Sequence, residues 1–187
     1  MKPTAILSKI LGELKENSSQ IDDKQVEQFA SYIGTGKRIY IAGAGRSGVA
    51  IKAFACRLVH LGLEVHFIGD ITVPHTKPGD LLIIGSGSGE TQSLVSLAQK
   101  AKKNGLNIIL NTLTSNSSIA SLADAKIVLP GASPKVTDKT HSGVSIQPMG
   151  SGFEQLSLLV YDAIVMFLMD KLNQTAEMMF ERHANLE

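Results

Sequence analysis

The chain has few of the residue types that build metal sites, disulfides or stacking platforms. It contains no tryptophan, and aromatic residues make up 5% of its 187 positions. This scarcity argues against stacked binding of nucleic-acid bases or open sugar rings. Cys56 is the one cysteine, so no disulfide can form within the chain. The histidines show neither H-x-x-E-H nor H-x-x-x-H spacing, so the sequence also lacks a tetrahedral zinc set, and we expect no metal.

Charge of one sign is not in excess either. Eighteen Lys and Arg against seventeen Asp and Glu leave a net charge of +1, which argues against a general nucleic-acid binder but allows a local anion site. The N-terminus lacks the charged, then apolar, then small pattern of a signal peptide, so we expect a cytoplasmic protein.

One nearly apolar stretch, residues 153–172, raises the question of a membrane span. Glu154, Asp162 and Asp170 interrupt it and leave fewer than about 18 consecutive apolar residues. A helix that is apolar on every side is more often buried, so we expect it to lie between the sheet and a neighbouring subunit, with no membrane partner.

The hydrophobic pattern alternates between short apolar runs and helical periods. Strands are predicted at 38–42, 64–68, 80–84, 107–111 and 126–129, and helices at 4–16, 22–33, 47–61, 91–104, 117–123 and 153–172. Strand–helix–strand spacing of this kind is typical of a parallel sheet with both faces covered. We therefore predict one domain, 1–187, with a three-layer α/β/α fold, a five-stranded parallel doubly wound sheet, and extra N- and C-terminal helices. Residues 130–150 show no apolar period, and a long loop of this kind is usually functional or disordered.

The first predicted strand runs into Gly43–Gly48, which has the G-x-G-x-x-G spacing of dinucleotide-binding turns. That interpretation also needs an acidic residue after the second strand, where Asp70 is the candidate. A tight strand-to-helix turn with no ligand explains the same glycines equally well, and both interpretations stay open on this motif alone.

A second glycine-rich loop, residues 85–91, follows the third strand. Its hydroxyl groups on Ser86, Ser88 and Thr91 stand among three glycines, immediately before a predicted helix whose first N–H groups have no partner in the helix. These donors together suit a phosphate group. The alternative is that Ser88 or Thr91 only caps the helix, which needs a single hydroxyl.

In an open parallel sheet, ligands lie beyond the carboxyl ends of strands where the winding reverses. If the first and third strands are neighbours, the two glycine loops face one cleft, which favours a small sugar phosphate over a dinucleotide. The predicted phosphate-binding residues are Gly45, Arg46, Ser47, Ser86, Gly87, Ser88, Gly89, Glu90 and Thr91.

These motifs resemble the sugar isomerase (SIS) domain. The resemblance rests on GAGRSG at 43–48, GD-x-T-x-P at 69–74, GDLLIIGSGSGET at 79–91, SIQPMGSGFEQ at 145–155 and ERHANLE at 181–187. Within this family the sequence is most similar to the 6-phospho-3-hexuloisomerases of the ribulose monophosphate route of formaldehyde assimilation. The resemblance implies a metal-independent homotetramer that interconverts D-arabino-3-hexulose 6-phosphate and fructose 6-phosphate. SIS domains also serve as non-catalytic phosphosugar sensors and as other phosphosugar aldose–ketose isomerases, and these remain alternatives.

Such a reaction needs a carboxylate that moves a proton between adjacent carbons through an enediol, with no cofactor. Glu154 is the candidate, although Ser151 and Glu154 also fit a capping box, in which the glutamate only bonds a backbone amide. The resemblance favours Glu154 as the base. Glu90 lies inside the phosphate loop, where repulsion by a phosphate suggests an orienting role. By the same resemblance, a neighbouring subunit lends His183 to the site.

Overall fold

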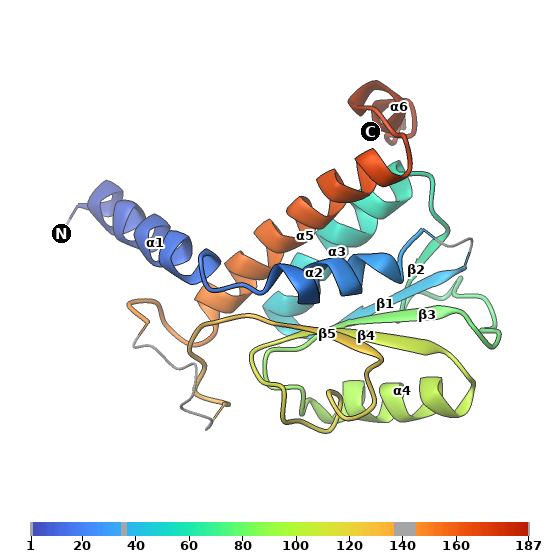
Figure 1. Cartoon of the computed structure of the whole chain (residues 1–187), viewed down its shortest axis with the longest axis horizontal. Helices are drawn as coiled ribbons and strands as arrows, with labels where there is room; N and C mark the ends of the chain where they lie inside the picture. Colours follow the sequence, from blue (N-terminus) through green and yellow to red (C-terminus); the bar gives the residue numbers. More distant parts are fainter. Residues whose placement is uncertain (1, 35–36, 137–144, 187) are drawn as a thin grey trace.

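Five parallel strands form one sheet at the centre of the structure, in the spatial order β2-β1-β3-β4-β5 (Figure 1). The strands are β1 (Ile39–Gly43), β2 (Val65–Phe67), β3 (Leu81–Gly85), β4 (Asn107–Thr112) and β5 (Ala125–Val128). The computed structural model describes residues 2–34, 37–136 and 145–186. The chain winds outward from β1 to β2 and then from β3 through β4 to β5, so the predicted doubly wound parallel sheet is confirmed.

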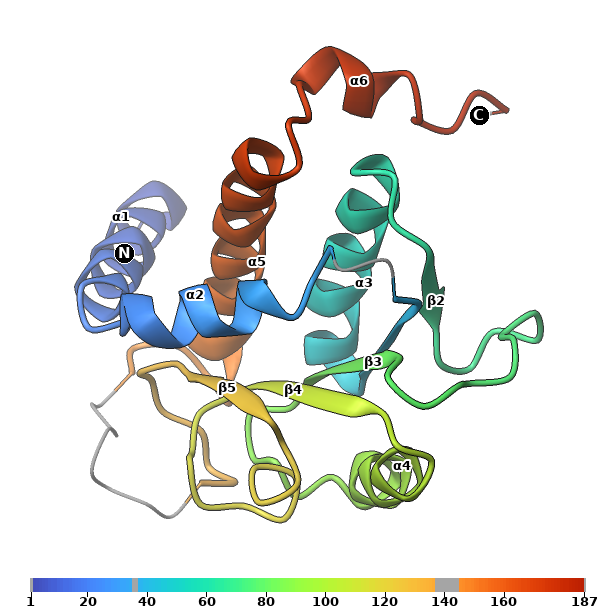
Figure 2. The same cartoon turned by 45° about the vertical axis from the view of Figure 1, so that its right-hand side comes forward.

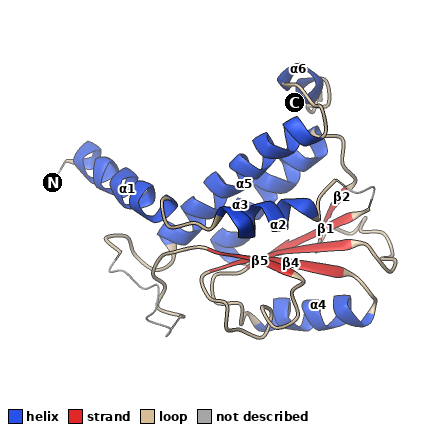
Figure 3. Cartoon of the chain, viewed as in Figure 1, coloured by secondary structure: helices blue, strands red, loops and turns tan. Residues whose placement is uncertain are grey.

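Helices cover both faces of the sheet, as the three-layer prediction requires. The helices are α1 (Pro3–Ser18), α2 (Asp23–Ser31), α3 (Gly45–His60), α4 (Gln92–Lys103), α5 (Ser151–Lys171) and α6 (Ala176–Phe180). Figure 2 shows α2, α3 and α5 on one side of the sheet and α4 on the other. Figure 3 shows that α1 and α6 extend beyond the sheet at the two ends of the helical layer.

The alternation of side chains along each strand builds two separate cores. In β1, Ile39 and Ile41 belong to the core under α3 and α5, whereas Tyr40 and Ala42 belong to the core under α4. The central strands β3 and β4 divide in the same way. Apolar residues therefore line both faces, which is why these strands are continuous apolar runs in the sequence.

The backbone of α3 lies very close to the backbone at the end of β1, where Gly48 packs against Gly43. A Cβ atom on Gly48 would lie 2.8 Å from the carbonyl oxygen of Gly43 and 3.0 Å from its carbonyl carbon. Only glycine avoids this clash, so the glycine spacing of the 43–48 loop serves helix–strand packing in this chain.

The predicted helix at 117–123 does not form, and this prediction is wrong. The segment folds as a series of turns because its polar groups bond elsewhere. The Ser117 hydroxyl accepts a hydrogen bond from the amide of Ala120, and the amide of Ile119 donates to the carbonyl of Gly89. Serine side chains that bond nearby amides compete with the helix, and here they fix the turns beneath the second glycine loop.

The helix α5 is the one helix in the described part that is long and apolar enough to cross a membrane, by length and composition alone. Half of that apolar stretch is buried inside the fold, against the sheet, α3 and α1. Its other side carries exposed Leu159 and Met166, at 52% and 68% exposure. Packing in the core therefore accounts for one side of this helix, and the other side is an uncovered apolar surface.

We predict that Gly48→Ala destabilises the fold by about 1–3 kcal/mol, because the new methyl group forces α3 away from β1. Urea unfolding followed by circular dichroism measures the change. Gly12→Ala is the matched control, since nothing lies within 4 Å of its added Cβ. In the exposed helix α1 this control should gain roughly 0.5–1 kcal/mol. Equal stability of the Gly48→Ala variant and the unchanged protein would contradict the close packing.

Candidate active site

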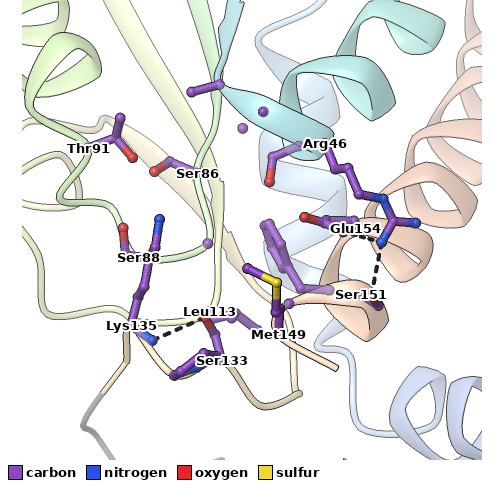
Figure 4. A pocket seen from close by; sticks show the side chains of 18 of the residues that line it. Arg46, Ser86, Ser88, Thr91, Leu113, Ser133, Lys135, Met149, Ser151 and Glu154 are labelled. Atoms are coloured by element: carbon purple, nitrogen blue, oxygen red, sulfur yellow. Dashed lines mark hydrogen bonds and ion pairs between the residues drawn. The ribbon is translucent and has the colours of Figure 1, made fainter. Parts of the chain in front are cut away.

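A cavity of about 540 Å³ opens at the carboxyl ends of β1 and β3 (Figure 4). The two strands are paired so that Gly43 lies opposite Gly85, which brings the two glycine loops side by side. Of the predicted phosphate-binding residues, the structure places Gly45, Arg46, Ser47, Ser86, Gly87, Ser88 and Thr91 on the wall of this cavity. Phe153 and Glu154, from the start of α5, close the opposite side.

The hydroxyl groups of the second loop are arranged to donate hydrogen bonds into the cavity. The Ser86 oxygen accepts from the amide of Gly89, and the Ser88 oxygen accepts from the amide of Glu90, both at 3.2 Å. A hydroxyl that accepts a bond still has its own proton to give. The loop therefore uses the lone pairs of these serines to hold its shape and keeps their protons for an anion.

Thr91 is the residue before α4, yet its side chain makes no capping hydrogen bond. Its carbonyl accepts from the amides of Leu94 and Val95, as the first turn of a helix requires. Thr91 thus lies on the cavity wall with its hydroxyl not used as a helix cap. This arrangement disfavours the interpretation of Thr91 as a simple helix cap.

The end of β4 holds the loop in place from below. The carbonyl of Asn111 accepts from the amide of Ser86 at 3.0 Å, and the carbonyl of Gly87 accepts from the amide of Leu113 at 3.0 Å. The Thr112 hydroxyl donates to the same Gly87 carbonyl at 3.1 Å. The loop is therefore fixed before any ligand arrives.

Gly89 and Glu90 belong to the loop but do not line the cavity. Gly89 has a φ of +62°, and a side chain there would collide with Ser117. The Glu90 carboxylate accepts hydrogen bonds from the amide and hydroxyl of Ser118, at 2.6 and 2.8 Å. These bonds lower the pKa of Glu90 and hold its charge behind the loop, away from an anion in the cavity.

The Glu154 carboxylate forms an ion pair with Arg46 at the cavity wall, at 2.8 Å. The Arg46 guanidinium also donates to the Ser151 hydroxyl at 2.9 Å, and Figure 4 shows these three side chains together on one side of the pocket. The residue before α5 is Gly150, with no side-chain cap, so the Ser151–Glu154 capping box does not form. The glutamate faces the cavity instead.

Two sets of buried contacts fix the helix that carries Glu154. The Asn111 amide donates to the hydroxyls of Ser157 and Tyr161, at 2.9 and 3.0 Å, and Tyr161 is fully buried. Burial raises the pKa of Tyr161 strongly, so this phenol stays protonated. Asn111 thereby links α5 to the strand that also holds the phosphate loop.

The second anchor comes from the N-terminal helix. The Glu13 carboxylate accepts from the Ser145 hydroxyl, the Ile146 amide and the Gln147 side chain, at 2.7, 2.9 and 3.3 Å. These residues lead directly into Pro148–Gly150, which form one wall of the cavity. No local pattern in the sequence indicates this role, because Glu13 is more than 130 positions away from its partners.

Sequence reasoning also missed Ser133, Lys135 and Met149, which line the cavity from the described parts of the 130–150 segment. The missing apolar period of that segment did indicate a functional loop, but it did not indicate which side chains face the ligand. Residues 137–144 of the predicted loop lie outside the described residues.

His183 does not lie at the cavity of its own chain. Its ring packs on His60, with 5.2 Å between ring centres, at the C-terminal end of α3. Arg46 is in the first turn of α3, and a helix of 16 residues spans about 24 Å. Arg182 holds this tail by donating to the carbonyl of His60 at 2.9 Å. Burial, followed by the charge of Arg57, lowers the pKa of His60.

The dinucleotide-binding alternative from the sequence finds no support in the geometry. Asp70, the acid that a dinucleotide site requires, does not line the cavity. Within the described residues, no group of three or more His, Cys, Asp or Glu side chains could hold a metal ion. The cavity wall combines neutral donors, two cations and one carboxylate, which suits an anion next to a group that transfers protons.

We predict that Glu13→Ala loosens the wall formed by Pro148–Gly150, because three donors lose their common acceptor. Hydrogen exchange of the peptide covering 145–150 should become faster, and the free energy of unfolding should fall by about 1 kcal/mol. Glu16→Ala, one turn further along α1 and exposed, is the control and should leave both quantities unchanged. Identical exchange in the two variants would show that Glu13 does not support this wall.

Comparison with known proteins places this architecture in a family. The SIS domain matches residues 33–156, which include both glycine loops and Glu154. The 3-hexulose-6-phosphate isomerase of Bacillus subtilis (strain 168) is 48% identical over 189 residues, covering 100% of both chains. That of Mycobacterium gastri is 41% identical, covering 97% of this chain and 89% of its own.

A solved structure agrees with these relatives. A hypothetical protein from Methanococcus jannaschii, for which the function of 3-hexulose-6-phosphate isomerase is inferred, is 32% identical with a TM-score of 0.78, and 100% of each chain is covered. Because the family model spans residues 33–156 and the relatives are similar over nearly their whole length, the chain belongs to the SIS domain family.

Proposed function

We propose that the chain is an isomerase that interconverts D-arabino-3-hexulose 6-phosphate and fructose 6-phosphate. The observation that carries this proposal is the position of Glu154, whose carboxylate shares one cavity with a loop of hydroxyl and amide donors. The names of the full-length relatives support the same reaction. A volume of about 540 Å³ is in the ordinary range for a small-molecule site.

The phosphate of the sugar binds at the Ser86–Thr91 loop. The hydroxyls of Ser86, Ser88 and Thr91 donate to its oxygens, and the first amides of α4 add the positive end of the helix dipole. This contact fixes one end of a flexible sugar. The carbon chain then extends across the cavity toward α5.

Glu154 transfers the proton. Its carboxylate removes a proton from the hydroxyl-bearing carbon next to the carbonyl, which leaves an enediolate. A proton then passes from that hydroxyl to the former carbonyl oxygen, and Glu154 returns its own proton to the former carbonyl carbon. The carbonyl thereby moves by one position with no net gain or loss of electrons, and the step requires no cofactor.

Arg46 stabilises the charge that this transfer creates. When Glu154 takes up the proton it becomes neutral, and the negative charge then lies on an oxygen of the enediolate. Before the reaction the Arg46 guanidinium lies 2.8 Å from the carboxylate. It is therefore close enough to interact with the oxygen that becomes negative. A cation beside a developing oxyanion lowers the barrier.

The proposal includes self-association, as a homotetramer in the cytoplasm. Exposed apolar side chains on α1 and α5, such as Leu11 and Met166 at 57% and 68% exposure, offer surfaces for a second copy. In such an assembly His183 would serve the cavity of a neighbouring chain, where it would exchange protons with the sugar oxygens. The ribulose monophosphate route of formaldehyde assimilation is the pathway in which the proposed substrate occurs.

A coupled assay tests the reaction. D-arabino-3-hexulose 6-phosphate is supplied, and fructose 6-phosphate is detected by enzymes that consume it. We expect turnover without added metal or nucleotide. Turnover of other phosphorylated ketoses and aldoses, but not of this one, would instead favour another isomerase of the family. Binding of fructose 6-phosphate with no turnover would favour a phosphosugar sensor.

We predict that Glu154→Gln lowers kcat by about 10²–10⁴-fold, because the amide cannot accept the proton. Incorporation of solvent deuterium into fructose 6-phosphate should stop, whereas binding of that sugar should remain nearly intact. Mass spectrometry and calorimetry measure the two quantities. Glu16→Gln is the control and should exchange deuterium at the original rate. Full turnover by the Glu154→Gln variant would leave this residue with a structural role only.

We also predict that Ser88→Ala combined with Thr91→Ala weakens binding of fructose 6-phosphate about tenfold or more, since two donors to a charged group are lost. The free energy of unfolding should fall by no more than about 1 kcal/mol, because the Thr91 side chain caps nothing and the Ser88 hydroxyl accepts a single bond, from the amide of Glu90. Thr175→Ala is the control, since Thr175 does cap α6 by accepting from the amide of Met178. It should leave sugar affinity unchanged. The opposite result, lost stability with full affinity, would identify the two hydroxyls as caps.

A further inference from the structure

The cavity contains a second cation that the function described above does not use. Its wall includes three charged side chains among the described residues: Arg46, Glu154 and Lys135. We propose that Lys135 is a phosphate-binding residue that makes the site selective for a dianionic phosphomonoester over an unphosphorylated sugar. This inference rests on the proposed function for the identity of the sugar, but not for the binding of phosphate.

The charges of the cavity divide into two groups. Arg46 and Glu154 form an ion pair at 2.8 Å, so together they present little net charge to a ligand. Within residues 2–34, 37–136 and 145–186, Lys135 forms no ion pair. The net positive charge of the cavity wall is therefore that of Lys135.

The positions of the two cations match this division. In Figure 4 the Lys135 side chain points toward the side of the pocket that carries Ser88, whereas Arg46 and Glu154 occupy the other side. An anion held by the Ser86–Thr91 loop would thus meet Lys135 rather than Arg46. The sugar would extend from that anion toward Glu154.

A well-anchored turn carries Lys135. The amide of Val136 donates to the carbonyl of Ser133 at 3.1 Å, and the Ser133 hydroxyl accepts from the amide of Lys135 at 3.3 Å. Pro134 stands at the second position of this turn, where its fixed φ favours the fold. Val136 packs on the core beneath, and the amide of Leu129 is bonded to β4 at 2.8 Å. The turn therefore directs Lys135 over the cavity without help from a ligand.

The chemistry of the ligand explains why a cation is needed here. A phosphomonoester carries close to two negative charges at neutral pH, whereas hydroxyls and amides are neutral and a helix end adds only about half a charge. A lysine ammonium is a flexible point charge that commonly binds phosphate in proteins. Lys135 supplies the full positive charge that the loop lacks, and this charge does not favour an unphosphorylated sugar.

Calorimetry and steady-state kinetics on Lys135→Met test the proposal. Affinity for inorganic phosphate and for fructose 6-phosphate should fall about tenfold or more, as expected for loss of a bond to a charged group. The KM for the sugar phosphate should rise by a similar factor, while kcat changes less than about twofold, because Lys135 stands apart from the proton transfer. Lys135→Arg keeps the charge and should recover most of the affinity.

Lys103→Met is the control, since this exposed lysine at the end of α4 does not line the cavity, and it should leave both affinities unchanged. Equal phosphate affinity in Lys135→Met and the unchanged protein would overturn the proposal, as would a fall in kcat with constant KM. If the unchanged protein binds phosphate but does not isomerise the hexulose phosphate, the proposed reaction fails. The phosphate affinities of the variants then still decide the role of Lys135.

Discussion

The pairing of β1 with β3 is the constraint on which the site depends. Because the two strands are parallel and in register, with Gly43 opposite Gly85, their loops leave the sheet at the same edge. A shift of one residue would turn every side chain of β1 to the other face and exchange the two cores that Ile41 and Ala42 now serve separately. The apolar alternation that stabilises the fold therefore also sets the distance between the two halves of the cavity.

Asn111 connects the binding half of the cavity with the reactive half. Its carbonyl holds the amide of Ser86, at the start of the phosphate loop, while its side chain bonds Ser157 and Tyr161 on the helix that carries Glu154. In the described part of the chain the Asn111 side-chain oxygen has no hydrogen-bond partner, and a buried polar atom of this kind reduces stability. Such a cost is expected where a residue is kept for positioning rather than for packing. One fully buried residue thus fixes the second glycine loop relative to the helix that carries Glu154.

The fold was predictable because its signals are local. Each strand is a short apolar run, and each glycine loop follows directly from a strand, so the order of elements and the two halves of the cavity could be inferred from the sequence. The segment 117–123 was misassigned because its amides and hydroxyls bond to one another and to Gly89, which no helical period reveals.

Two features of the cavity could not be inferred from the sequence. The contacts of Glu13 join positions far apart in the chain. The direction of Lys135 depends on the shape of a turn. Glu154 was ambiguous for a similar reason, because the sequence shows neither its ion pair with Arg46 nor that α5 begins after Gly150 without a side-chain cap.

The ion pair between Arg46 and Glu154 must open or rearrange when a sugar enters, and its exposure makes this possible. The Arg46 side chain is 61% exposed, and exposed pairs of this kind contribute about 1 kcal/mol or less to stability. Binding of a phosphate at the opposite side of the cavity can easily offset so small a cost. The Glu154 side chain is only 19% exposed and is held by its helix, so the arginine is the partner that moves. The pair therefore orients the Glu154 carboxylate toward the cavity, and in the proposed reaction it leaves the guanidinium close to the enediolate oxygen.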